Sequence, residues 1–179
     1  AFVNFDCEVS VIAARGIDGS FQAFNIAENV HKNHILHTST IPANVHGDVV
    51  KTAIEYAQKI AEHLNYVGVF AVEFFVENAN SDAFNICVNE IAPRVHNSGH
   101  WTQNGCTVDQ FEQHIRAITG WPLGDGQRHS DVVMENLIGD DMDRVPELAQ
   151  TPDCALHLYG KAETKPGRKM GHVNHIKRG

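Results

Sequence analysis

The chain has 179 residues, of which 42% are hydrophobic and 20% are charged, which is typical of a folded globular protein rather than a disordered one. Its formal net charge of -8 argues against nonspecific binding of nucleic acid. No apolar segment approaches the roughly 20 residues of a membrane span, so we expect no membrane association. The 4 cysteines are isolated, without a CxxC pair, which favours free thiols and a cytoplasmic location over disulfides.

The first part of the chain predicts a β-hairpin and then a long helix. Residues 2–16 are rich in β-branched and aromatic side chains, and the turn segment GIDG separates them from a second strand-like segment, residues 20–31. Between Gly47 and Asn65, apolar residues recur at spacings of three and four, which is typical of an amphipathic helix of about five turns. Asp48 lies near the positive end of the dipole of this helix.

The middle of the chain predicts two strands and a second helix. Residues 66–78 and 83–92 flank the polar loop ANSD, and both are strand-like. Residues 107–119 have helical periodicity, with Thr107 expected as the N-cap and Gly120 as the stop.

A segment rich in glycine, proline and polar residues, WPLGDGQRHS, predicts a boundary between a domain of residues 1–126 and another of residues 127–179. Beyond it, residues 131–139 and 154–160 predict strands around a short helix near 141–149, and residues 166–176 predict a turn that enters a last strand. The pattern indicates an α+β fold with mostly antiparallel strands, because the βαβα alternation of a doubly wound sheet is missing.

Two glutamates on adjoining predicted strands suggest a metal site. Glu73 lies in the apolar segment VFAVEFFV, and Glu90 ends the partner strand. If the loop reverses the chain near residue 81 or 82, the two carboxylates are almost opposite each other. At roughly 5 Å they repel, so the pair indicates a shared proton, a cationic partner or a metal. Oxygen ligands favour Mg²⁺ or Mn²⁺ over zinc, and substrate phosphates would complete such a site, as in an ATP-using enzyme. The alternative is that Glu73 pairs with a buried Arg or Lys.

The loop after Glu90 is rich in groups that bind anions. Pro93 stiffens the exit from the strand, and Arg94 has a planar fork suited to carboxylate, phosphate or bicarbonate. His96 exchanges protons near neutral pH, and the following NSG segment permits a turn with exposed N–H groups. His96 and His100 are four residues apart, but Gly99 argues against a zinc-binding helix.

The segment NEIAPRVHNSGHWTQNG resembles the signature of the 5-(carboxyamino)imidazole ribonucleotide synthetase family of ATP-grasp enzymes. Further blocks resemble this family in the same order: EVSVIAARGIDGS, AENVHKNHIL, LNYVGVFAVEFF, VVMENLIGDD and KPGRKMGHVN. The resemblance implies the C-terminal half of an ATP-grasp domain plus part of a small β-rich C-terminal domain. It also implies that ATP activates bicarbonate as carboxyphosphate, from which the carboxyl group passes to aminoimidazole ribonucleotide in purine biosynthesis.

Carried over by position, the resemblance implies Mg²⁺ (or Mn²⁺) ligands at Glu73 and Glu90. It implies an ATP site with Asn89 and Glu90 beside the nucleotide, Glu8 on the ribose hydroxyls, and His31. The alternatives are that Glu8 pairs across the first hairpin and that His31 is a surface histidine.

For the reacting groups, the resemblance implies that Arg94 and His96 lie near bicarbonate and carboxyphosphate. Asn97, Lys161 and Arg168 would bind the imidazole ribonucleotide, and the last two would grip its 5′-phosphate. The alternative is that the segment KAETKPGRK is a solvated basic face.

Other enzymes and a non-catalytic function remain as alternatives. Ala92 stands where many ATP-grasp enzymes have Asn, and the form NExAPR also fits formate-dependent glycinamide ribonucleotide transformylase. That relative typically has HDTG where this chain has HNSGHW, and biotin-carboxylase-like enzymes fit less well. A non-catalytic nucleotide-binding domain is a further alternative. We expect that the chain is a C-terminal fragment of a homodimeric protein and that it has no ATP turnover alone.

Overall fold

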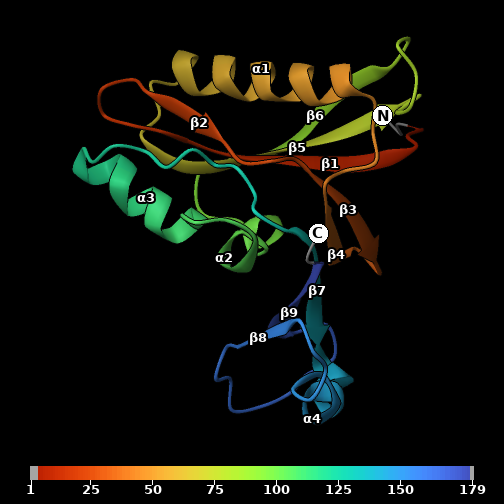
Figure 1. Cartoon of the computed structure of the whole chain (residues 1–179). Helices are drawn as coiled ribbons and strands as arrows, with labels where there is room; N and C mark the ends of the chain where they lie inside the picture. The colour runs from red at the N-terminus through yellow and green to blue at the C-terminus, as the bar shows by residue number, and fades with distance from the viewer. Residues whose placement is uncertain (1–3, 178–179) are drawn as a thin grey trace.

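A single antiparallel sheet of nine strands runs through residues 4–177, the part of the chain that the computed structural model describes (Figure 1). Its order is β6-β5-β1-β3-β4-β7-β9-β8, and β2 pairs with β1 beside this path. The strands are β1 (Cys7–Arg15), β2 (Phe21–Ala23), β3 (Ala27–Lys32), β4 (Ile35–Ile41), β5 (Gly68–Glu77), β6 (Asn85–Ala92), β7 (Asp131–Ile138), β8 (Cys154–Leu158) and β9 (Lys169–Lys177). The predicted α+β class with antiparallel strands is confirmed.

Helices cover both faces of the first part of the sheet (Figure 1). The long helix α1 (Gly47–His63) lies over one face, and α2 (Thr102–Gly105) and α3 (Gln110–Thr119) lie over the other. The 3₁₀ helix η1 (Asn97–Gly99) precedes α2, while η2 (Gly139–Arg144) and α4 (Val145–Leu148) follow β7. Within the described residues no helix is both long and apolar enough to cross a membrane.

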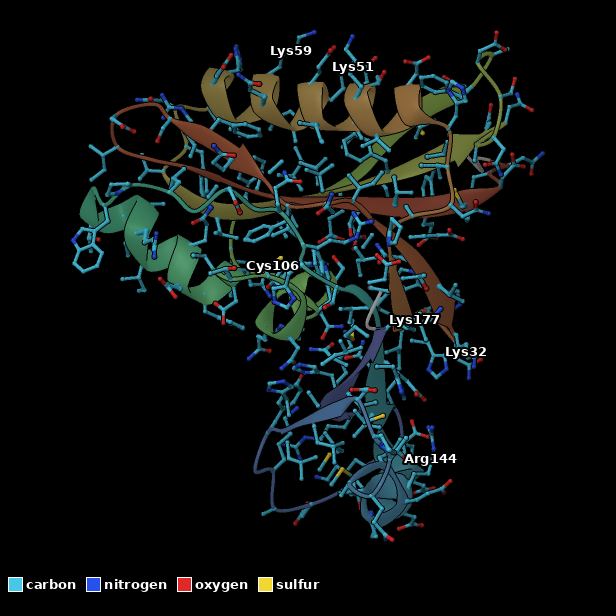
Figure 2. All side chains as sticks on the ribbon, in the orientation of Figure 1. Lys32, Lys51, Lys59, Cys106, Arg144 and Lys177 are labelled. Atoms are coloured by element: carbon cyan, nitrogen blue, oxygen red, sulfur yellow. The ribbon has the colours of Figure 1, made fainter. Side chains whose placement is uncertain are left out.

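The amphipathic pattern of α1 determines how this helix packs. Its buried residues are Val49, Ala53, Ala57 and Ala61, one on each successive turn. Small alanine side chains let the helix lie close to β1 and β5, where it shares a hydrophobic core with the apolar side chains of those strands. Lys51 and Lys59 project from the outer side of the helix, away from the sheet (Figure 2).

The second predicted helix begins later than its sequence pattern suggested. Its N-cap is Asp109, whose carboxylate accepts hydrogen bonds from the N–H groups of Phe111 and Glu112 at 2.8 and 2.9 Å. The prediction of Thr107 as the cap was therefore wrong, because the aspartate offers a charged acceptor that also suits the positive end of the helix dipole. Gly120 ends the helix in the left-handed conformation, with φ of 75°, as expected.

The predicted strands are present, but one further strand was missed. The segment expected as one strand after GIDG divides into β2 and β3, and β4 had no sequence prediction. β4 pairs with β3 on one side and with β7, about 95 residues later in the sequence, on the other. All four cysteines are free thiols, and Cys106 lies between the sheet and α2 (Figure 2).

The pairing of β4 with β7 carries the sheet into the last third of the chain. There β7, β9 and β8 form three antiparallel strands, with η2 and α4 at the far end (Figure 1). This part has a small core of its own, built on Leu137, Leu148 and Val173. The division of the chain at residue 126 stays a prediction.

Candidate functional site

Glu73 and Glu90 are paired directly across β5 and β6, as the sequence predicted. The register slips by one residue beside them: Phe74 pairs with Val88, which leaves Asn89 as the extra residue of a β-bulge. A bulge of this kind bends the strand and changes the direction of the side chains around it. Because β6 is the edge strand of the sheet, Asn89 and Glu90 are exposed on it.

The carboxylates of Glu73 and Glu90 repel each other when both are ionised. Glu73 is mostly buried, with a side chain 15% exposed, and burial raises its pKa. His31 opposes this shift, while the charge of Glu90 adds to it. A cation would lower the energy of the ionised pair, so the donor set fits a hard divalent ion. The described residues contain no group of three or more His, Cys, Asp or Glu that could hold a metal alone, so other oxygen ligands would have to complete the site.

A pocket of about 480 Å³ brings several of the predicted residues together. Glu73, Glu90, His96 and Asn97 line it, with His31 at one side. The amide Nδ2 of Asn97 is buried and has no hydrogen-bond partner among the described residues, so it is a donor free for a ligand. The remaining lining residues are His34, Ile35, Leu36, Gly167 and Lys169.

His96 is held in one tautomer. Its Nδ1 accepts hydrogen bonds from the hydroxyl and the backbone N–H of Ser98, at 2.9 and 3.3 Å. The neutral ring therefore carries its proton on Nε2, which lies 3.7 Å from Oε1 of Glu73. Burial, and then the positive charges of Arg94 and Lys169, lower the pKa of His96 to about 4. At neutral pH, His96 thus presents an uncharged N–H donor to the pocket.

A buried serine on β1 supports this arrangement. The hydroxyl of Ser10 donates to the Ser98 hydroxyl at 2.9 Å, so the Ser98 hydrogen is left for His96. Ser10 is fully buried and pairs with Glu73 in the register of β1 and β5. The His96 imidazole, through Ser98 and Ser10, and the Glu73 carboxylate are thus both positioned by paired residues of β1 and β5.

Glu8 and His31 meet on β1 and β3. The Oε2 of Glu8 lies 2.5 Å from Nδ1 of His31, and both side chains line a second, smaller pocket of about 270 Å³. His31 lines the first pocket as well, so it lies between the two. This contact between β1 and β3 is also what the alternative expected, a pairing of Glu8 across the first hairpin, so the nucleotide role of both residues stays a prediction.

Besides Glu8, which lines only the smaller pocket, four predicted site residues do not line the main pocket. Asn89 and Arg94 are exposed, and Nη1 of Arg94 donates to the carbonyl of Val95 at 3.0 Å. Arg168 is exposed and donates to a nearby backbone carbonyl. Lys161 donates to the carbonyl of Lys169 at 2.5 Å and lies over the ring of Tyr159.

Lys169 is the pocket cation that sequence reasoning missed. It begins β9, lines the pocket, and is about half buried; burial lowers its pKa, while Glu73 acts in the opposite direction. The sequence offered several cations in the segment KAETKPGRK, and only the fold selects among them. The one sequence signal for Lys169 is that it directly follows Arg168, which was itself a predicted site residue.

Known proteins match nearly the whole chain. The family model described as the ATP-grasp domain matches residues 1–111, and that of the phosphoribosylaminoimidazole carboxylase C-terminal domain matches residues 132–178. The N5-carboxyaminoimidazole ribonucleotide synthase of Brucella melitensis is 53% identical over 176 residues, which is 98% of this chain and 48% of the relative.

Solved structures are similar over the whole described chain. An ADP complex of an N5-carboxyaminoimidazole ribonucleotide synthetase has a TM-score of 0.93 and 44% identity, covering 99% of this chain and 46% of the other. The enzyme of Aspergillus clavatus, in complex with ADP and 5-aminoimidazole ribonucleotide, has a TM-score of 0.91 and 32% identity, covering 98% and 48%. The chain spans about half the length of these relatives. It belongs to the ATP-grasp family, in the branch of the N5-carboxyaminoimidazole ribonucleotide synthases.

Proposed function

We propose that the whole protein carboxylates 5-aminoimidazole ribonucleotide in a reaction that consumes ATP and bicarbonate, in purine biosynthesis. The observation that carries this proposal is the pairing of Glu73 with Glu90 in a pocket that also holds His96, Asn97 and Lys169. The pocket combines a place for a divalent cation with neutral and cationic donors for an anion. Two similar enzymes were solved with ADP, and one of these also with 5-aminoimidazole ribonucleotide, which supports the same ligands here.

In the proposed reaction, a bicarbonate oxygen attacks the γ-phosphorus of ATP, and ADP leaves. The amine of the ribonucleotide then attacks the carboxyl carbon of carboxyphosphate, so that a C–N bond forms and a C–O bond breaks. The proton of the amine passes to the departing phosphate. Glu73 and Glu90 would hold Mg²⁺ (or Mn²⁺), which when bound supplies charge neutralisation for the phosphates of ATP.

The residues near the carboxyl donor, His96 and Arg94, each have a defined role. The Nε2–H of His96 donates a hydrogen bond to an oxygen of the carboxyl donor, since its Nδ1 is occupied by Ser98 and cannot serve as the base. Arg94, next to the pocket and exposed, supplies positive charge to the same anion. On the nucleotide side, Glu8 accepts from the ribose hydroxyls, with His31 and Asn89 beside the nucleotide.

The acceptor would lie toward the start of β9. We propose that Lys161 and Arg168 hold the 5′-phosphate of the ribonucleotide, with Asn97 as a further donor. Lys169 adds a positive charge inside the pocket, between this phosphate and Glu73. We also propose that the whole protein is a cytoplasmic homodimer.

The decisive experiment measures ADP release by the whole protein with substrates omitted in turn. The proposal expects release that requires both bicarbonate and 5-aminoimidazole ribonucleotide. Release that instead requires formate and glycinamide ribonucleotide would overturn it in favour of the transformylase, and nucleotide binding without turnover under any of these conditions would favour a non-catalytic domain.

A further inference from the structure

The loop that carries His96 is fastened to α3 by one buried side chain. Gln110 is the first residue of α3 and is fully buried. Its Oε1 accepts the backbone N–H of His96 at 2.9 Å, and its Nε2 donates to the backbone carbonyl of His96 at 2.8 Å. One amide thus satisfies both polar groups of the His96 backbone, in the way that a neighbouring strand would.

The same amide reaches the next histidine of the loop. The second hydrogen of Gln110 Nε2 goes to Nδ1 of His100 at 3.0 Å, so His100 also carries its proton on Nε2. The loop fits tightly over this side chain: a Cβ atom on Gly99 would lie 2.6 Å from Oε1 of Gln110. The glycine at position 99 is therefore the residue that lets the loop close over the amide.

The backbone of Gln110 adds another link. Its N–H donates to the hydroxyl of Thr102 at 3.1 Å, and that hydroxyl donates to the carbonyl of Gly99 at 2.6 Å. Thr102, like Gln110, is fully buried. Both ends of the loop from His96 to Thr102 are consequently fixed to the first turn of α3.

We propose that Gln110 is a positioning residue for the reaction, acting through His96. The proposal rests on the function proposed above. Ser98 sets the rotation of the imidazole, but Gln110 sets where the backbone of His96 lies relative to Glu73. A shift of about 1 Å at a group that must meet a reacting atom costs roughly 100-fold in rate. Among the described residues, no hydrogen bond or ion pair joins Gln110 to Glu8 or His31 on the nucleotide side.

The chain contains a matched control one turn further along α3. Gln113 is also fully buried, and its amide makes the same paired contact with the backbone of Gly124: Nε2 donates to the carbonyl at 2.9 Å, and Oε1 accepts the N–H at 2.8 Å. Replacing either glutamine by methionine leaves one backbone N–H and one carbonyl without their partner, and Gln110→Met also removes the hydrogen bond to Nδ1 of His100. Only Gln110 is connected to the pocket.

The experiment compares Gln110→Met with Gln113→Met in the whole protein, by melting temperature, steady-state kinetics and backbone amide exchange. We expect similar losses of melting temperature in the two variants. In Gln110→Met, kcat should fall about 100-fold with the KM for ATP within about twofold of wild type. In Gln113→Met, kcat should stay within about threefold of wild type. A milder variant, Gln110→Asn, keeps the amide and should show the same pattern with a smaller loss.

Amide exchange separates this inference from the proposed function. The N–H of His96 should exchange about tenfold faster in Gln110→Met and at the wild-type rate in Gln113→Met, where the N–H of Gly124 should be the one affected. An equal loss of kcat in both methionine variants, or wild-type kcat in Gln110→Met, would overturn the positioning role. A wild-type protein without bicarbonate-dependent turnover would refute the proposed function, and unchanged exchange at His96 would still refute the role of Gln110 in holding it.

Discussion

Acidification should weaken the fold through a stack of histidines between the loop at His100 and the last strands. The ring of His172 lies parallel to those of His100 and His157, with centroids 4.7 and 4.5 Å apart. Its Nδ1 is 2.9 Å from the hydroxyl of Tyr159. Burial, with the neighbouring histidines as a second cause, lowers the pKa of His172 to about 3 and that of His100 to about 4.

The size of the effect follows from proton linkage. In the unfolded chain a histidine has a pKa near 6.5, so between pH 6.5 and about 4 the unfolded state binds protons that the native state does not. The contribution of these two neutral histidines to the free energy of unfolding is therefore fully present above pH 6.5 and is lost as the pH falls toward about 4. From pH 7 to pH 5 the loss is about 2 kcal/mol for each of the two histidines. At pH 5 both are still neutral in the folded state, so the two losses add.

The assay is urea unfolding at pH 7 and pH 5 for wild type and His172→Phe. Phenylalanine keeps a ring in the stack and removes the titrating group, while the lost contact with Tyr159 lowers stability equally at both pH values. The variant should lose about 2 kcal/mol less than wild type between the two pH values. The same pH dependence in both proteins would refute the linkage argument.

Further tests address the metal pair and the last strands. Glu90→Gln should abolish turnover by the whole protein while leaving the melting temperature near wild type, because Glu90 is exposed on an edge strand; normal activity would remove the metal assignment. Chelation with EDTA should stop ADP release and Mg²⁺ should restore it, whereas full activity in EDTA would contradict a divalent ion at Glu73. Glu135→Gln should cost about 2 kcal/mol at pH 7 in urea unfolding, since hydrogen bonds from His175 and then Arg144 lower the pKa of Glu135 to about 2. That contribution is lost as the pH falls from about 4.5 toward 2, so the free energies of unfolding of wild type and Glu135→Gln should converge at low pH. A difference that stays constant with pH would contradict the stabilising role of the ionised Glu135.

The strands around the metal pair could be predicted because their register depends on a short connection. The loop after Glu77 brings Glu73 to within one residue of Glu90, because the register next to the loop would set Glu73 opposite Asn89 and the bulge moves the partner to Glu90. The bulge at Asn89 was not visible in the sequence, since nothing in VNEIA marks an extra residue. The position of α1 was equally clear, because its alanine stripe repeats over four turns.

The residues that the sequence did not reveal are those whose roles depend on distant partners. Strand β4 is defined by its pairing with β7, and Lys169 enters the pocket only because β9 pairs with β7. Gln110 occupied an ordinary helical position in the sequence, and its contacts with His96 arise only when the loop folds over it. Thr107 was a plausible cap until Asp109, two residues later, proved to be the stronger acceptor.

The pairing of β4 with β7 limits how access to the pocket can change. Glu73 on β5, His31 on β3 and Lys169 on β9 lie in one continuous ladder of backbone hydrogen bonds. Neighbouring strands are held about 4.8 Å apart, so the width of the pocket is fixed by the lattice of the sheet itself. A hinge motion between the part of the sheet up to β4 and the part from β7 onward would have to break the β4–β7 hydrogen bonds. Any motion that changes access to the pocket would therefore involve loops or segments outside the sheet rather than a hinge within it.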